Sequence, residues 1–385
     1  MTRKKSSERK KQKSKSRRRS VRKSKSRSNR KSRRKSRGRS TKKIILSPKS
    51  SCRKDNLDFF FSPETKVGLG RFYWKMKISR YHYLYAPRTI KLFSKGKKYI
   101  FRSPKSLGKG GFGGIFEYRD FDHGMDIVLK IEGGSYARLL GNRRSEPSER
   151  EISEALNRNG NKCNTIRTRY IESRGARYRR DHYYIMEKYS GDTSELLKIL
   201  KSEYSPKERI KIWLEVVETV RKQMACLAKL GFYYTDLKPP NILYCKNPDG
   251  TISINLGDLG AAVANKQGYE EDHTHLSFWS PPEYFEDSIR MTQKDGTVNK
   301  KKGAAVLLFL LGMLGLVITE DLDKNIFVTN ILDDLSSEKK YKEGLNSYLD
   351  KTQLNSKQRG VFRKLLTLNP LERIKKVDIN KPFKW

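Results

Sequence analysis

The segment from Asp236 to Asn241, which reads D-L-K-P-P-N, constrains this chain more than any other. An acid is followed by a lysine two residues later and by an asparagine five residues later, which is the spacing of a phosphoryl-transfer loop. In such a loop Asp236 would deprotonate an acceptor hydroxyl, Lys238 would neutralise the migrating phosphoryl group, and Asn241 would hold Mg²⁺. Lysine and asparagine are common in loops, so this interpretation depends on further motifs in the right order.

A glycine-rich segment lies upstream and fits the pattern G-x-G-x-x-G-x-V, with Gly108, Gly110, Gly113 and, in the valine position, Ile115. Glycines allow the backbone to approach phosphates and to point its N–H groups at them. Strand-like sequence flanks the segment on both sides, so we expect it at the tip of a β-hairpin. The same glycines at the start of a helix would instead indicate a dinucleotide site.

An apolar strand, Ile127 to Leu129, then ends in Lys130 and fits the pattern V-A-I-K. A buried strand rarely carries an inward lysine without partners, and ATP phosphates together with a helix acid would supply them. Glu149 is the preferred acid, because apolar residues at +3 and +7 complete one helix face. Glu151, in an R-E-I-S pattern, remains an alternative.

Three more motifs follow in order. The alternating strand 252–256 leads into a D-L-G sequence, in which Asp258 would coordinate Mg²⁺. Pro281-Pro282-Glu283 stands where an A-P-E sequence would close an activation segment. Near the C-terminus, Arg373 could pair with that glutamate inside a helical lobe.

With these motifs in place, residues of about 99 to 380 resemble a eukaryotic-type protein kinase, and Lys238 is similar to the serine/threonine branch. The sequences at 166–170 and 183–187 have a weaker similarity to vaccinia-related and large-DNA-virus kinases. The resemblance implies an α+β, two-lobed protein kinase fold that binds ATP and Mg²⁺. It implies a small β-rich N-lobe at 99–189 and a large helical C-lobe at 190–385.

The same resemblance assigns further residues. Met186 would be the gatekeeper, and the backbone from Glu187 to Tyr189 would form the hinge that binds adenine. The catalytic loop reads Y-T-D rather than H-R-D, so Thr235 replaces the arginine that would receive an activation-loop phosphate. This substitution implies activity without such phosphorylation. Leu307 falls where the family has an aspartate that anchors the catalytic loop.

The chain has a formal net charge of +43, and residues 1–43 hold 24 Lys/Arg, 11 serines and a single acid. Such a segment cannot bury enough surface to offset its chain entropy, so we expect a disordered tail. It would bind nucleic acid or another polyanion through counterion release, unless it is only a solubilising tail. We expect the aromatic and basic residues 44–98 to pack on the N-lobe; stacking on bases is the alternative.

The rest of the sequence gives no sign of a membrane span, a metal site or a disulfide framework. The apolar run 304–318 is shorter than the roughly 20 residues of a membrane span and predicts a buried helix. His273 and His275 are interpreted as activation-segment surface. The cysteines are far apart in sequence, so neither a zinc site nor a disulfide framework is indicated, which favours a reducing interior. These cysteines are Cys52, Cys163, Cys226 and Cys245.

The sequence thus predicts an ATP- and Mg²⁺-dependent serine/threonine protein kinase tethered to polyanions by its tail. We expect a monomer that is intracellular, nuclear or virion-associated, not secreted, and without a membrane span. One alternative is a nucleic-acid-binding structural or virion protein whose kinase-like domain is an inactive scaffold. Another is a kinase of small molecules or lipids.

Overall fold

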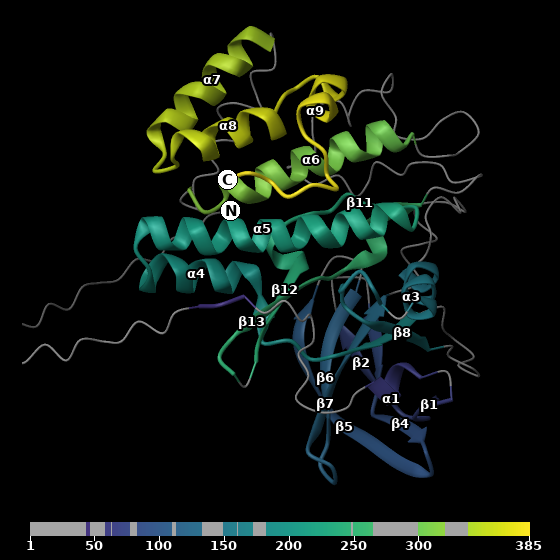
Figure 1. The fold of residues 1–385 in the computed structure, drawn as a ribbon. Coiled ribbons are helices and arrows are strands. Elements are labelled where there is room, and N and C mark those ends of the chain that lie inside the picture. The colour runs from purple at the N-terminus through teal and green to yellow at the C-terminus, as the bar shows by residue number, and fades with distance from the viewer. Residues whose placement is uncertain are drawn as a thin grey trace, which may run out of the picture. The chain divides into compact units, whose positions relative to one another are not determined.

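The computed structural model describes residues 44–46, 58–62, 64–77, 83–109, 113–132, 149–159, 161–171, 182–247, 249–264, 299–319 and 338–385. Contacts divide the chain into Met1–Ser40 and Thr41–Trp385, and all that follows concerns the second unit. The tail of residues 1–43, and with it the expectation of disorder, lies outside the described residues. Strands dominate the first part of this unit and helices dominate the second (Figure 1).

The first part is built on a seven-stranded sheet with the order β1-β4-β5-β6-β7-β9-β8, in which every neighbouring pair is antiparallel. The strands are β1 (Lys66–Leu69), β4 (Thr89–Ser94), β5 (Lys97–Lys109), β6 (Gly113–Asp120), β7 (Met125–Glu132), β8 (Thr168–Ile171) and β9 (His182–Met186). Strands β5 and β6 are the hairpin expected around the glycine-rich segment. Helix α3 (Glu149–Arg158) precedes β8.

The N-terminal extension forms part of this sheet and also covers one face of it. Helix α1 (Asp58–Phe61) and the ribbon of β2 (Tyr73–Lys77) and β3 (Tyr83–Pro87) contribute Phe60, Leu84 and Ala86 to its core. Burial alternates along β4 and β6, as a strand with one covered face requires. The domain boundaries drawn from the sequence remain predictions.

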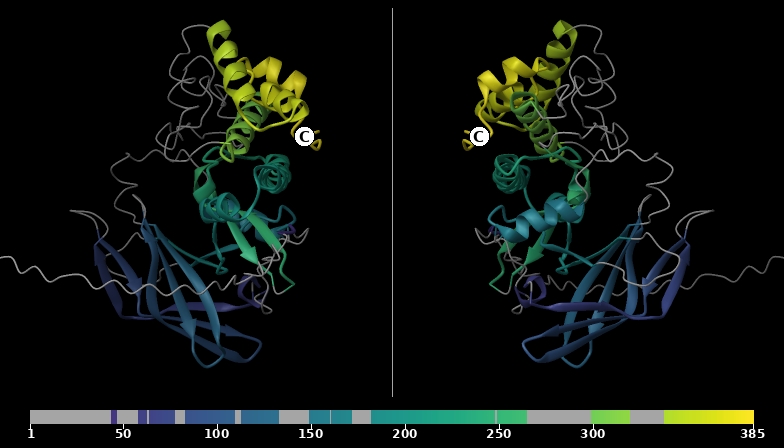
Figure 2. Two further views of the ribbon diagram at one scale, coloured as in Figure 1. Left: turned by 90° about the vertical axis from the view of Figure 1, so that its left-hand side faces the viewer. Right: turned by 90° about the vertical axis from the view of Figure 1, so that its right-hand side faces the viewer.

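The second part is mainly helical and holds the larger core. Its helices are α4 (Thr193–Glu203), α5 (Pro206–Lys229), α6 (Lys300–Leu316), α7 (Glu338–Lys351), α8 (Ser356–Leu365) and α9 (Pro370–Lys376). Short strands and turns join them: β10 (Gly191–Asp192), β11 (Phe232–Tyr234), η1 (Pro239–Asn241), β12 (Ile242–Lys246), β13 (Ile252–Leu256), η2 (Leu259–Ala261) and β14 (Ala262–Ala264). Helices α7, α8 and α9 lie together on the far side of α6 from α5 (Figure 2).

The two long helices begin and pack as their sequences suggest. Helix α5 starts with a capping box between Ser205 and Glu208 and has proline at its first position. Helix α6 is buried along almost its whole length, which explains why its sequence is apolar all round. A Cβ on Gly303 would lie 2.5 Å from the ring of Tyr233, so only glycine lets α6 approach β11. No described helix is long and apolar enough to cross a membrane.

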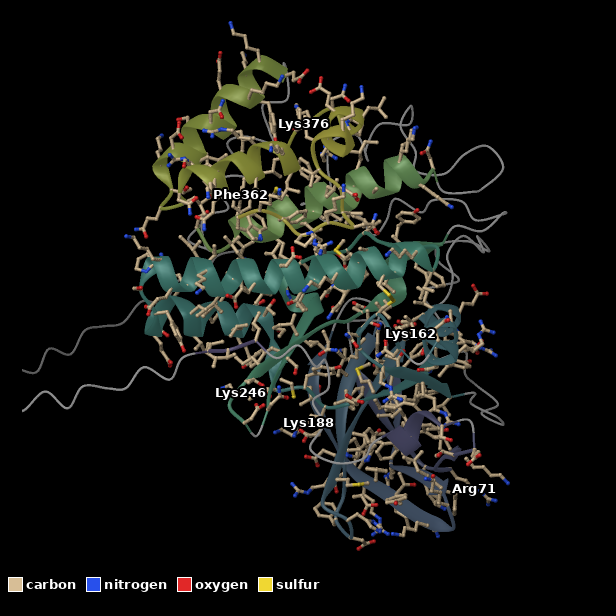
Figure 3. The ribbon with its side chains drawn as sticks, in the orientation of Figure 1. Arg71, Lys162, Lys188, Lys246, Phe362 and Lys376 are labelled. Atoms are coloured by element: carbon tan, nitrogen blue, oxygen red, sulfur yellow. A yellow bond between two sulfur atoms is a disulfide. The ribbon has the colours of Figure 1, made fainter. Side chains whose placement is uncertain are left out.

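The interpretation of the cysteines is wrong, because Cys163 and Cys226 form a disulfide and Cys245 is also disulfide-bonded. Cys163 lies in the loop after α3, next to Lys162 (labelled in Figure 3), and Cys226 lies near the end of α5. Their Cα atoms are 5.3 Å apart although 63 residues separate them in sequence. Spacing along the chain could not reveal this proximity, and the argument for a reducing interior loses its basis.

Candidate active site

The D-L-K-P-P-N segment folds into a compact loop around Asp236. The Asn241 amide donates 2.8 Å hydrogen bonds to both the backbone oxygen and the carboxylate of Asp236. Lys238 Nζ lies 3.0 and 2.8 Å from the two carboxylate oxygens of Asp236. The Thr193 hydroxyl holds the loop from α4 by donating to the oxygen of Pro239. The three side chains singled out from the sequence are therefore in direct contact.

A second loop carries Asp258 and is tied to the first. The buried Tyr234 hydroxyl donates to the backbone oxygen of Gly257 at 2.8 Å, and the Gly257 N–H donates to the backbone oxygen of Asn241 at 2.8 Å. Burial holds the pKa of Tyr234 well above its ordinary value, so its hydroxyl stays protonated as a donor. Asp258 has a positive φ of 48° and its side chain is 48% exposed. Sequence reasoning missed this link, although a tyrosine in the histidine position of H-R-D was its signal.

Lys130 stands at the centre of a group of carboxylates. Its Nζ lies 2.5 Å from Glu149 on α3, 2.7 Å from Asp258 and 2.9 Å from Glu132. Of the two candidate acids on α3, Glu149 forms this ion pair, and its side chain is only 1% exposed. Glu132 was not foreseen, although it follows Lys130 by two residues on one strand and therefore shares its face of the sheet.

Lys130 and the carboxyl groups around it shift one another's pKa values. Burial alone would lower the pKa of Lys130, but the three carboxylates hold that pKa well above its usual range, so the ammonium is charged. Burial raises the pKa of Glu149, and although Lys130 opposes the shift, Glu132 and Asp258 add to it. Even when Glu149 is protonated, the carboxylates of Glu132 and Asp258 outnumber the single ammonium of Lys130, and this surplus of negative charge is what a divalent cation would neutralise.

The donor set also fits magnesium. Because the Asn241 nitrogen is used by Asp236, its side-chain oxygen is the atom available to a metal, together with the Asp258 carboxylate. Mg²⁺ is commonly held by one or two carboxylates plus substrate phosphates rather than by a full protein cage. No group of three or more His, Cys, Asp or Glu side chains suited to a metal occurs among the described residues.

The strands place an apolar surface beside Lys130. In the sheet register Ile115 on β6 lies opposite Lys130, and its side chain is 38% exposed. Met186, the proposed gatekeeper, ends β9 opposite Val128 and is 7% exposed. Glu187 and Tyr189, which follow β9, are buried and half-buried. An exposed aliphatic side chain next to a held lysine is suited to an adenine ring with phosphates beyond it.

The glycines of the hairpin serve packing as well. A Cβ on Gly113 would lie 2.2 Å from the Ile131 oxygen, so glycine is required there by the close approach of β7. Gly108 lies in β5 with open space around its Cβ position, and Gly110 falls outside the described residues. Lys188, which follows β9 and is labelled in Figure 3, forms ion pairs with Glu117 on β6 and Asp126 on β7.

Two expectations concern the large lobe. Glu283, together with Pro281, Pro282, His273 and His275, lies outside the described residues, so its pairing with Arg373 stays a prediction. Arg373 is fully buried and donates to the backbone oxygens of Thr367, Ala305 and Leu368 at 2.8–3.0 Å. Leu307 is buried in α6, so this position offers no carboxylate to the catalytic loop.

Comparison with known proteins identifies the fold that this geometry belongs to. The model of the protein kinase domain matches residues 101–381. No curated protein matches the chain. The match covers well over half of the sequence, including both loops, the glycine hairpin and Lys130. The chain is therefore a member of the protein kinase family, with a β-rich N-terminal part and a helical C-terminal part.

Proposed function

We propose that this protein kinase transfers the γ-phosphoryl group of ATP to serine and threonine hydroxyls of proteins. The observation that carries the proposal is the contact of Asp236 with both Lys238 and Asn241. Protein kinases generally use ATP with Mg²⁺, and the surplus carboxylates around Lys130 favour this pair of cofactors here.

Each residue then has a defined task. Asp236 accepts the proton of the substrate hydroxyl, and Lys238, already at its carboxylate, neutralises charge on the transferring group. Lys130, positioned by Glu149, binds the ATP phosphates. Asp258 and Asn241 are the residues that would hold Mg²⁺, which supplies charge neutralisation when it is bound.

A labelling assay on serine, threonine and tyrosine peptides tests this function. The Asp236→Asn protein should lose at least about 10²-fold in kcat, the lower range for a lost acid–base group, with an unchanged Tm. Asp350→Asn, which removes an exposed carboxylate from α7, is the matched control. Labelling of tyrosine alone would refute the hydroxyl specificity. No ATP turnover in the wild type would favour the structural-protein alternative.

We further propose that residues 1–43 hold the kinase on nucleic acid, in a nuclear or virion setting, and that phosphorylation releases it. Each phosphate adds about −1.5 to −2 charges, so modification of the 11 tail serines would cancel most of the charge of the tail. The test is DNA affinity against salt for the full chain, for a chain starting at Ile44, and for ATP-treated protein. A truncated chain that binds DNA as tightly as the full chain would contradict the proposal.

A further inference from the structure

The sheet of the β-rich part has one covered face and one exposed face. On the covered face Ile90, Leu92 and Phe101 share a core with residues of α1 and β3. Residues in register on antiparallel strands share a face. Lys66 lies opposite Phe93, and Phe93 lies opposite Lys98. These three side chains therefore form one row across β1, β4 and β5, on the side away from the core.

Further cations extend this row along the same face. Lys91 lies on β4 two residues before Phe93, and Arg102 on β5 lies opposite Arg119 on β6. We call these six residues the basic sheet face: Lys66, Lys91, Phe93, Lys98, Arg102 and Arg119. All are exposed, and Phe93, a large aromatic residue, is 43% exposed. Strands β4, β5 and β6 lie side by side (Figure 1).

Acids balance the charge of this face only at its border with β7, where Asp126 lies near Arg119 and where Glu117 and Asp126 pair with Lys188. Residues 65–116 contain 13 Lys/Arg and no Asp or Glu. Among the described residues, no carboxylate forms an ion pair with Lys66, Lys91, Lys98 or Arg102. Arg119 has Asp126 at 3.9 Å, at the β7 border of the face. Four cations on adjoining strands therefore repel one another with no internal partner, which favours an anionic ligand.

Protection of a sheet edge does not explain this arrangement. Lysines are common on edge strands, where they prevent pairing with other chains. Lys66 lies on the edge strand β1, but Lys91, Lys98 and Arg102 lie on β4 and β5, which are paired on both sides. A solubilising surface would not require an exposed aromatic ring either. Lys98 Nζ sits 5.9 Å from the centre of the Phe93 ring, so an aromatic surface and a cation are presented together.

We propose that the basic sheet face binds single-stranded nucleic acid, with Phe93 stacking on a base and the surrounding cations contacting phosphates. Neighbouring strands are about 4.8 Å apart and alternate residues about 6.7 Å apart, so the cations surround the ring on the scale of a few nucleotides. Aromatic rings within a basic surface are the common device for single strands, whose base faces are accessible. In a duplex the base faces are stacked and cannot contact Phe93. A membrane is a less suitable ligand, because a single exposed ring offers little apolar surface for insertion.

This surface is distinct from the tail and from the residues of phosphoryl transfer. It is nevertheless close to the proposed ATP site in the sheet. Arg119 and Ile115 both lie on β6 at positions that alternate with buried residues, so their side chains point to the same side of the sheet. A bound single-stranded nucleic acid would therefore lie along the sheet that carries Lys130. The folded domain, and not only the tail, would then help to hold the kinase on nucleic acid.

The experiment measures binding of the full-length chain to a fluorescent 20-nucleotide oligothymidine at several salt concentrations. The test variant combines Lys91→Gln, Lys98→Gln and Arg102→Gln. Single strands lose about 0.7 in log–log salt slope per phosphate contact. We expect the slope of this variant to fall by about 2, with affinity about tenfold or more weaker at 0.15 M salt. Phe93→Ala should weaken binding about tenfold without a change of slope.

The control variant removes the same charge from the helical part, by Lys357→Gln, Lys364→Gln and Lys375→Gln, all of which are exposed. It should bind like the wild type. Equal losses in the test and control variants would show an effect of net charge only and overturn the proposal. So would unchanged oligothymidine binding by the test variant or by Phe93→Ala. A loss confined to vesicles containing 30% phosphatidylserine would assign the face to membranes instead.

Discussion

The Cys163–Cys226 disulfide makes a stability prediction that can be worked out from its position. It closes a sequence separation of 63 residues and joins the loop after α3 to α5. In the chain-entropy description, a loop of this length lowers the entropy of the unfolded chain by about 14 cal/mol/K, which is about 4 kcal/mol at 25 °C. Removal of both cysteines, Cys163→Ala with Cys226→Ala, should lower the free energy of unfolding by about that amount.

Thermal unfolding gives the assay. With an unfolding entropy of about 2 cal/mol/K per residue, the unit Thr41–Trp385 should lose about 6 °C in Tm. The double variant and the wild type are each measured with and without reductant. Reductant should lower the Tm of the wild type by about 6 °C more than that of the double variant. If reductant acts equally on both proteins, or if the Cys163→Ala single variant exposes no additional thiol, the reasoning is refuted.

The remaining predictions concern the site. Because burial raises the pKa of Glu149 to about 8, kcat/KM should rise between about pH 7 and about pH 9 as its carboxylate forms; Glu149→Gln should flatten this profile, while Glu151→Gln should keep it. Arg373→Ala removes three hydrogen bonds to backbone oxygens from a fully buried position and should cost at least about 3 kcal/mol in unfolding free energy. Arg363→Ala breaks exposed contacts only and should cost under about 1 kcal/mol. Phosphatase treatment should leave activity unchanged, because Thr235 offers no cation to a phosphate; a large loss would contradict that reading.

The sequence predicted those parts of the site that are set by neighbouring residues. The Asp236 loop closes through contacts over two and five residues, so its pattern is visible in the chain. The hairpin around the glycines likewise follows from two paired strands that are close in sequence. The buried helix α6 follows from an apolar run too short to cross a membrane.

Contacts between segments that are distant in sequence could not be predicted from local sequence patterns. The disulfide joins residues 63 apart, and Glu149 reaches Lys130 only because α3 packs beside the sheet. Periodicity left Glu149 and Glu151 open, because both lie in the first turn of one helix. Composition also could not show which aromatic residues of the extension are buried and which are exposed. Phe60 is buried in the core, whereas Phe93 is exposed.

The bond between Tyr234 and Gly257 explains how this kinase can hold its two loops together without a charged switch. The hydroxyl is buried and neutral, and it joins the strand before Asp236 to the residue before Asp258. A neutral hydrogen bond between buried groups needs no counter-ion, whereas an arginine in the position of Thr235 would carry an uncompensated charge until a phosphate arrived. With Thr235 that desolvation cost is absent. The two loops are then positioned by burial and hydrogen bonding alone, and this is the physical basis for expecting activity without phosphorylation of the activation segment.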